Sequence, residues 1–388
     1  MKDLDNNVTL NANWSYPTAV RFGAGRIAEL ADACHSAGIK KPLLVTDKGI
    51  AKLPITQRAL DVLAAGGIKA GLFTEVDVNP TDNNLLAGIE CYRNGHYDGV
   101  VAFGGGSALD LGKLVAFQQG QTRSVWDFED IDDWWKRADN ACIAPIIAVP
   151  TTAGTGSEVG RAGVLLNTAE HVKKIIFHPK ILPTVVIADP ELTIAMPQFF
   201  TAGTGMDAFI HCLEAYSSPF YHPMSQGIAL EGMRLALTYL PRAYRNGEDI
   251  TARAHMMAAA AMGAVAFQKG LGATHSISHA VGALFNTHHG MTNAVVLPTV
   301  LRFNRIKIEA RIATAATYLE IDGGFDGFYA HLQELRQALA IPNKLSEFGV
   351  NDKPMEQMIK LAMADPSTSG NPIAPTEEDF RQLLAELL

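Results

Sequence analysis

The chain has 388 residues, which exceeds the size at which one hydrophobic core keeps growing, so two domains are expected. Hydrophobic residues make up 48% of it and the formal net charge is -8, a combination typical of soluble globular proteins that offers no attraction for nucleic acid. The sequence has no basic and apolar secretory signal, and no run of about eighteen apolar residues lacks charges and helix breakers. We therefore expect a cytoplasmic protein without membrane contact, whose partners are small molecules.

The first half of the chain alternates short apolar runs with amphipathic stretches. The runs end near Asp47, Phe73, Gly104, Pro150 and Pro190. They are brief, rich in β-branched residues and closed by turn formers, which is typical of strands. Residues 55–67 and 83–96, which lie between such runs, have the pattern of helices. This alternation predicts a parallel sheet covered by helices, in an α/β domain that spans residues 1–190.

The character of the sequence changes after Pro190. Strand-like runs disappear, and segments rich in alanine, leucine and methionine follow, such as residues 229–246 and 251–267. The second of these segments is apolar enough to be a buried helix. We therefore expect an all-α second domain at residues 191–388.

A glycine-rich turn follows one of the predicted strands. Gly104, Gly105, Gly106 and Ser107 stand directly before a helical stretch. Glycines allow the backbone to approach a ligand closely, and the free amide groups at the start of a helix favour a phosphate. The pattern indicates a pyrophosphate-binding turn, although Leu109 stands where the usual dinucleotide fingerprint has its third glycine. A purely structural turn is the alternative.

Two further segments follow predicted strands and can contact a nucleotide. The carboxylate of Asp47 can accept hydrogen bonds from the ribose hydroxyls of NAD and would repel the extra phosphate of NADP, or it can simply cap a turn. Residues 150–158 supply the hydroxyl groups of Thr151, Thr152 and Thr155 together with two flexible glycines. This loop can wrap around a nucleotide, or it can be a polar connection without a ligand.

Four potential metal ligands are the most specific feature of the second half. Asp207 and His211 are four residues apart, so on a helix they project from the same face. His275 and His289 lie on either side of a predicted turn, which can close the four donors around one ion. One carboxylate and three imidazoles suit Fe(II), Zn(II), Co(II) or Ni(II). His279 follows His275 by one helical turn and can be a fifth donor, a proton relay, or a residue that orients a ligand.

A nucleotide-binding half and a metal-binding half together favour hydride transfer. A divalent ion acts as a Lewis acid that lowers the pKa of an alcohol, and the alcohol carbon then gives a hydride to a nicotinamide ring held nearby. This chemistry needs no side-chain nucleophile.

The motifs GGGSALDLGK, PTTAGTGSEV, GTGMDAFIHCLEAY and GLGATHSISHAVGALFNTHHG resemble those of the iron-containing (group III) alcohol dehydrogenases, in order through most of the chain. The resemblance implies the fold shared with glycerol dehydrogenases and dehydroquinate synthases, NAD and Fe(II) as cofactors with Zn(II) possible, and a homodimer. It implies the metal ligands Asp207, His211, His275 and His289, with His279 and His275 at the site of reaction. It implies cofactor contacts from Asp47, Asn79, Gly104, Gly105, Gly106, Ser107, Thr151, Thr152, Thr155 and Lys173.

Three hypotheses for the activity follow. The first is the interconversion of a primary alcohol and its aldehyde. The second is a 4-hydroxybutyrate dehydrogenase, because AFQKGLG and GSEVGR are similar to segments of those enzymes; Arg161 would then bind a substrate carboxylate or form a structural salt bridge. The third is a sugar-phosphate lyase or cyclase, which would need a Lys/Arg cluster that the sequence near the histidines lacks. His288 stands where many relatives have proline and can narrow or polarise the rim of the site.

Overall fold

The computed structural model describes residue 16 and residues 18–388, and contacts within the chain divide them into two compact units. The α/β unit contains residues 18–196 together with Gly247–Met257. The helical unit contains Pro197–Asn246 and Ala258–Leu388. Each unit contains one of the two predicted sets of functional residues.

The α/β unit is built on a parallel sheet of six strands in the order β1-β8-β5-β4-β2-β3. The strands are β1 (Ala19–Phe22), β2 (Pro42–Val45), β3 (Gly71–Phe73), β4 (Gly99–Gly104), β5 (Ile146–Pro150) and β8 (Val185–Ala188). The residues of β2, β4, β5 and β8 are all buried, which explains why they read as continuous apolar runs. In the register, Val45 lies beside both Phe73 and Ala102, so β2 and β3 end level with each other and β4 extends two residues further, to Gly104.

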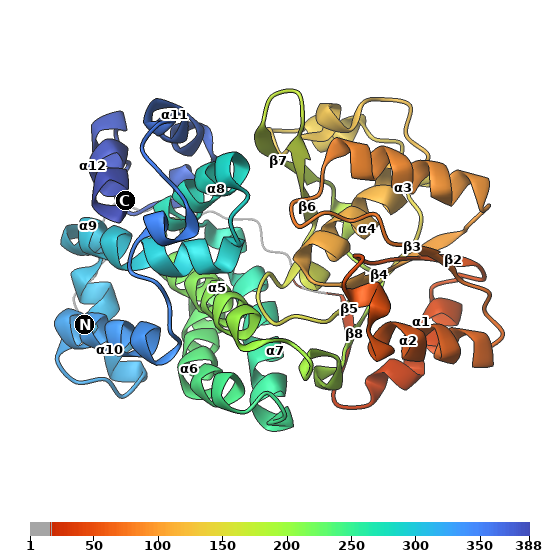
Figure 1. Cartoon of the computed structure of the whole chain (residues 1–388), viewed down its shortest axis with the longest axis horizontal. Coiled ribbons are helices and arrows are strands. Elements are labelled where there is room, and N and C mark those ends of the chain that lie inside the picture. Colours follow the sequence, from red (N-terminus) through yellow and green to blue (C-terminus); the bar gives the residue numbers. More distant parts are fainter. Residues whose placement is uncertain (1–15, 17) are drawn as a thin grey trace. The chain divides into compact units, whose positions relative to one another are not determined.

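Helices cover both faces of this sheet (Figure 1). They are α1 (Leu30–Ser36), α2 (Pro54–Ala65), α3 (Asp82–Asn94) and α4 (Gly106–Gln118). The side chain of Thr81 caps the start of α3 in a reciprocal pair with Asn84. Most of α4 is buried, because it packs against β4 on one side and against β6 on the other.

Three strands were missed by the sequence analysis. Strands β6 (Ala162–Asn167) and β7 (Val172–Phe177) form an antiparallel hairpin, and β1 lies at the edge of the main sheet. Most positions of β7 are half-buried and include Lys173 and Lys174, which interrupt its apolar residues and leave only a short run at 175–177. The edge strand β1 is largely exposed and shows no buried alternation.

The helical unit is formed by long helices that pack around a central one. They are α5 (Gln198–Ser217), α6 (Pro223–Arg245), α7 (Ile250–Ala266), α8 (Ala273–Phe285), α9 (His289–Tyr318), α10 (Gly324–Ala338), α11 (Met355–Ala364) and α12 (Glu377–Leu387). The first residues of α7 belong to the α/β unit. Helix α5 is buried along nearly its whole length and packs against α6 and α9. Helices α8 and α9 are joined by a short turn in which Asn286 adopts a left-handed conformation.

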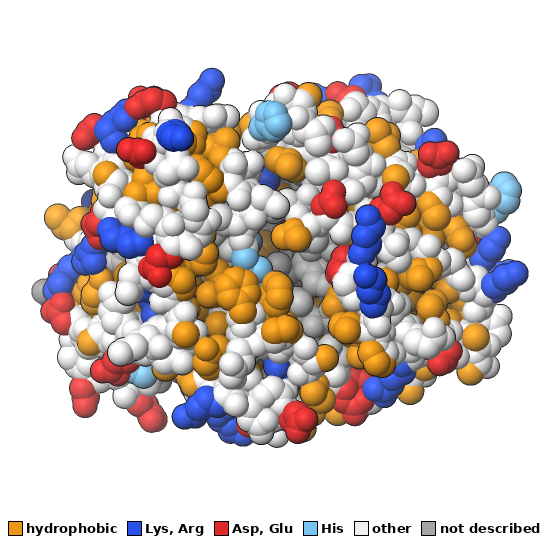
Figure 2. All heavy atoms as spheres, viewed as in Figure 1, with side chains coloured by type: hydrophobic (Ala, Val, Ile, Leu, Met, Phe, Trp, Pro, Cys, Tyr) orange, Lys and Arg blue, Asp and Glu red, His pale blue; other side chains and the backbone are white. Residues whose placement is uncertain are grey.

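One segment, Ile250–Lys269, is long and apolar enough to cross a membrane by length and composition. However, 56% of its most apolar window is buried inside the protein. Core helices often pass the same test, so the segment is weak evidence for a membrane span. On the face shown in Figure 2, acidic and basic side chains are interspersed.

Candidate metal centre and nucleotide site

The carboxyl ends of β2 and β4 lie where the connections of the sheet change direction. From β2 the chain passes through α2 to β3 on one side, whereas from β4 it passes through α4 to β5 on the other. In open α/β sheets, ligands bind beyond the carboxyl ends of the strands at such a switch point. Asp47 follows β2 and Gly104 ends β4, so both predicted nucleotide residues lie at this point.

The glycine turn lies against the threonine loop that follows β5. Gly104 has a φ of 146°, a conformation that favours glycine. A Cβ added to Gly106 would lie 2.6 Å from Cγ2 of Thr155, and one added to Gly105 would lie 3.2 Å from Cγ2 of Thr152. No side chain in the described part of the chain caps the start of α4. The turn thus presents backbone amide groups that suit a phosphate.

Hydrogen bonds fix three more predicted residues beyond the carboxyl ends of the strands. Oδ1 of Asp47 accepts from the backbone N–H groups two and three residues further on, at 2.7 and 2.9 Å, so the carboxylate does cap the turn after β2. The N–H of Thr151 donates to the last carbonyl of β4 at 2.9 Å. The hydroxyl of Ser107 donates to the carbonyl of Val78 and thereby ties the glycine turn to the segment before α3.

The segment before α3 also connects Asn79 and Lys173 to the same edge of the sheet. The N–H of Leu166 donates to the carbonyl of Pro80 at 2.7 Å, next to Asn79. Lys173 pairs with Leu166 across the β6–β7 hairpin. The structure therefore brings all the residues predicted to contact the cofactor to one end of the α/β unit, while their role in binding stays a prediction.

The four predicted metal ligands converge inside the helical unit. Asp207 and His211 project from the buried helix α5, His275 projects from the first turn of α8, and His289 begins α9. Oδ1 of Asp207 lies 3.9 Å from Nε2 of His211, 3.7 Å from Nε2 of His275 and 3.5 Å from Nε2 of His289. One ligand atom from each residue falls within 4.8 Å of all the others.

This donor set fits a divalent ion. A tetrahedral ion about 2.1 Å from each donor needs donor atoms about 3.4 Å apart, close to the separations observed here. Nδ1 of His275 lies 2.6 Å from Oε2 of Glu214. A carboxylate can only accept, so Nδ1 carries the proton and the lone pair of Nε2 is left for an ion. Nδ1 of His289 lies 3.2 Å from the hydroxyl of Ser278, which can fix this second ring in the same way.

The charges of the cluster are strongly coupled. Burial raises the pKa of Asp207, but the imidazoles of His211, His289 and His275 outweigh burial and hold it well below its usual range. Burial lowers the pKa of His275, but Glu214 and Asp207 outweigh it and raise this pKa to about 9. In the absence of an ion, His275 therefore binds a proton at neutral pH, and an ion must displace that proton.

His279 faces the cluster through ring contacts. Its ring stacks on that of His289 with centroids 5.2 Å apart, and it meets the ring of His275 edge-on at 5.9 Å. Nδ1 of His279 lies 2.8 Å from Oδ2 of Asp365, whose other oxygen accepts from the N–H of Ser367. The pKa of Asp365 is lowered to about 2, because His279 and the hydrogen bonds outweigh burial. Asp365 is thus an ionised acceptor that fixes the orientation of His279.

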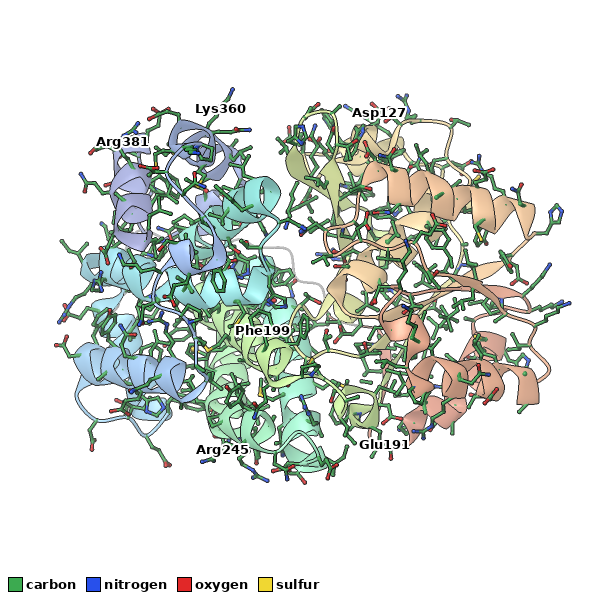
Figure 3. The ribbon with its side chains drawn as sticks, in the orientation of Figure 1. Asp127, Glu191, Phe199, Arg245, Lys360 and Arg381 are labelled. Carbon is green, nitrogen blue, oxygen red and sulfur yellow. The ribbon has the colours of Figure 1, made fainter. Side chains whose placement is uncertain are left out.

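Aromatic rings surround the start of α9. His288 accepts a hydrogen bond from the N–H of Met291 and so caps this helix. Its ring meets those of Phe199 and Phe200 edge-on, at 5.4 and 5.3 Å. Both phenylalanines are exposed, and Phe199, labelled in Figure 3, lies at the start of α5. His288 therefore belongs to a cluster of aromatic rings next to the ligand His289, while its effect on the rim of the site stays a prediction.

Arg161 lies in the α/β unit. Its guanidinium lies 5.3 Å from the centre of the Phe177 ring, and burial lowers its pKa although Asp130 opposes this change. The carboxylate-binding role of Arg161 stays a prediction.

Glu214, Asp365 and Asn293 were not predicted from the sequence. Glu214 follows His211 by three residues on the ligand face of α5, and Asn293 follows His289 by one turn of α9, so helical spacing is a weak signal for both. Asp365 lies 86 residues from His279 in the sequence, and no local pattern links the two.

The fold and the two sites define a metal-binding protein with a nucleotide-type α/β unit. Comparison with known proteins is consistent with this class. Residues 17–190 match the model of the iron-containing alcohol dehydrogenases, and residues 201–388 match the C-terminal model of the same family. The chain therefore belongs to the iron-containing alcohol dehydrogenase family and is an oxidoreductase, as its motifs predicted.

Similar proteins share the whole length of the chain. A 4-hydroxybutyrate dehydrogenase of Cupriavidus necator is 37% identical, over 96% of this chain and 98% of the relative. An NAD-dependent methanol dehydrogenase of Bacillus methanolicus is 33% identical, over 97% and 100%. The crystal structure of a 1,3-propanediol oxidoreductase superimposes with a TM-score of 0.91 at 33% identity, covering 97% of this chain and all of that one. The predicted fold is thereby confirmed.

Proposed function

We propose that this protein interconverts a primary alcohol and its aldehyde with NAD(H), using Fe(II) bound by Asp207, His211, His275 and His289. The convergence of one carboxylate oxygen and three imidazole nitrogens, each within 4.8 Å of the others, carries this proposal. Zn(II) would fit the same donors.

The donor set suits an alcohol substrate because it leaves positive charge at the site. One carboxylate and three neutral imidazoles cancel only one of the two charges of a divalent ion. Such an ion supplies Lewis acidity that lowers the pKa of an alcohol. His279, oriented by Asp365, then has Nε2 available to accept the hydroxyl proton.

We assign the switch point of the α/β unit to NAD. The backbone amides at the start of α4 would bind the pyrophosphate, with Thr151, Thr152 and Thr155 around it. Oδ1 of Asp47 is already engaged in its turn, so we assign Oδ2 to the ribose hydroxyls. We assign Asn79 and Lys173 to further contacts with the cofactor.

For the substrate, we propose an ω-hydroxy acid such as 4-hydroxybutyrate. The relative with 37% identity is named for this activity, whereas relatives named for methanol and 1,3-propanediol are 33% identical. Arg161 is the candidate to bind the carboxylate. We further propose that the enzyme is cytoplasmic and forms a homodimer. Light scattering on purified protein would test the oligomeric state.

The experiment is a substrate panel under anaerobic conditions. Protein loaded with Fe(II) is supplied with NAD or NADP and with 4-hydroxybutyrate, 1,3-propanediol, methanol or 1-butanol, and absorbance of the reduced cofactor is followed. We expect turnover with NAD and the highest kcat/KM for 4-hydroxybutyrate. Arg161→Gln should raise the KM for 4-hydroxybutyrate but not for 1-butanol. If none of these alcohols reduces the cofactor, the proposed reaction is wrong.

A further inference from the structure

Asn293 lies in contact with three of the four ligand atoms. It follows His289 by one turn of α9, and its side chain is completely buried. Its Nδ2 atom is 2.8 Å from Oδ1 of Asp207 and 3.2 Å from Nε2 of both His275 and His289. The amide group therefore faces the same point as the metal ligands.

Packing alone does not account for an asparagine at this position. The other end of the amide, Oδ1, is buried without a hydrogen-bond partner in the described part of the chain. A buried carbonyl that makes no hydrogen bond is destabilising, and leucine would fill a similar volume without that cost. The hydrogen bonds that the amide does make all go to ligand atoms, so its role is to be sought at the metal centre.

The bond to Asp207 is the one that is compatible with a bound ion. An amide nitrogen has two hydrogens, so it cannot donate to three acceptors at once. An ion would take the lone pairs of both imidazole nitrogens. A carboxylate oxygen has a second lone pair, so Oδ1 of Asp207 can accept from Asn293 and still bind the ion. This bond is also the shortest of the three and is strengthened by the negative charge.

The backbone around this pair favours the same interaction. A Cβ added to Gly290, in the first turn of α9, would lie 2.2 Å from the carbonyl oxygen of Gly203 and 3.2 Å from Cβ of Asp207. Glycine is therefore required for α9 to approach α5 at this point. This close approach places Asn293 within reach of Asp207.

We propose that Asn293 is a positioning residue of the metal centre, which holds the Asp207 carboxylate in the orientation that binds the ion. The inference rests on the proposed metal centre. Residues that orient a metal ligand typically contribute about 10- to 100-fold to metal affinity. Asn293 should therefore contribute to metal binding although it donates no electron pair to the ion.

The test measures metal binding rather than activity. Co(II) is titrated into metal-free protein against a competing chelator, and its absorption spectrum reports the geometry of the site. For Asn293→Leu we expect the Kd for Co(II) to rise about 10- to 100-fold and the spectrum to change. Thr292→Val is the matched control, because it removes a neighbouring buried hydroxyl that donates to Thr287 and to the carbonyl of His288, and it contacts none of the four ligand side chains. Its Kd should stay within about threefold of the original.

Three outcomes separate the possibilities. If Asn293→Leu is folded by circular dichroism and binds Co(II) with unchanged or higher affinity, the positioning role is wrong. If the leucine variant does not fold, Asn293→Ala removes the same donor and is measured in its place. If the unmodified protein itself binds Co(II) no better than an Asp207→Ala variant, the proposed metal centre fails, and the role of Asn293 fails with it.

Discussion

The affinity of the metal centre should increase steeply with pH, because His275 must lose a proton before its Nε2 can bind an ion. The ring is buried between Glu214 and Asp207, which raise its pKa to about 9 against the effect of burial. The ordinary value is near 6.5. At pH 7, about two units below this pKa, removing the proton from His275 lowers the metal-binding free energy by about 3 kcal/mol, at about 1.4 kcal/mol per unit.

The free energy of unfolding of the metal-free protein should instead decrease as the pH rises. A raised pKa in the folded state stabilises the fold fully below the unfolded value, and this stabilisation is lost as the pH rises through the folded value. The metal-free protein should thus lose stability between about pH 6.5 and pH 9. Ion binding should strengthen over the same interval.

The assay is a titration of metal-free protein with Co(II) or Zn(II) against a chelator at several pH values, corrected for protonation of the chelator. We expect the association constant to increase about tenfold per pH unit between pH 7 and pH 9 and then to level off. Glu214→Gln keeps one acceptor oxygen, which can serve Gly272 and His275, but it loses the acceptor for Thr274 and removes the charge, so it should flatten this dependence. An association constant that does not change between pH 7 and pH 9 would refute the reasoning.

Three further substitutions test other parts of the account. Gly106→Ala would place a methyl group 2.6 Å from Thr155, so the KM for NAD should rise about tenfold or more while the metal content is unchanged. Gly227→Ala, on α6 where an added methyl group meets no atom within 4 Å, is the control and should leave stability unchanged or slightly increased. Asp365→Asn weakens the hydrogen bond that orients His279, so it should lower kcat about 10- to 100-fold with little change in KM. An equal loss of bound metal would instead indicate a structural role for Asp365. Lys113→Met breaks a buried ion pair with Asp110 and removes the hydrogen bond from Nζ to the carbonyl of Ser157. The free energy of unfolding should decrease by about 3 kcal/mol and NAD should bind more weakly, whereas an unchanged melting temperature would contradict this prediction.

The sequence predicted the buried core of the α/β unit because fully buried parallel strands leave a clear apolar signal. The runs ending near Asp47, Phe73, Gly104, Pro150 and Pro190 all correspond to strands of the sheet. The β6–β7 hairpin was not predicted, since its second strand is half-buried and contains two lysines. Strands whose stability comes from pairing rather than burial leave little pattern in a single sequence.

The metal cluster was predictable in a similar, partial way. Helical spacing joins Asp207 to His211, and a histidine-rich turn joins His275 to His289, so the donors could be recognised without a structure. The groups that orient them gave a weaker signal in the sequence. Glu214 and Asn293 follow ligands on the same helices, but acidic and amide residues at such spacing are too common to be specific. Asp365 reaches His279 only through the packing of α11 against α8.

The most direct test of the metal-dependent reaction is a paired measurement on the unmodified protein and on His275→Ala. Metal content is determined by mass spectrometry after anaerobic loading with Fe(II), turnover is followed with 4-hydroxybutyrate and NAD, and NADH binding is followed by fluorescence. We predict about one ion per chain and activity in the unmodified protein, and loss of both in the variant with NADH binding retained. A His275→Ala variant that still oxidises the alcohol at the original rate would contradict the assignment of this cluster as the site of reaction.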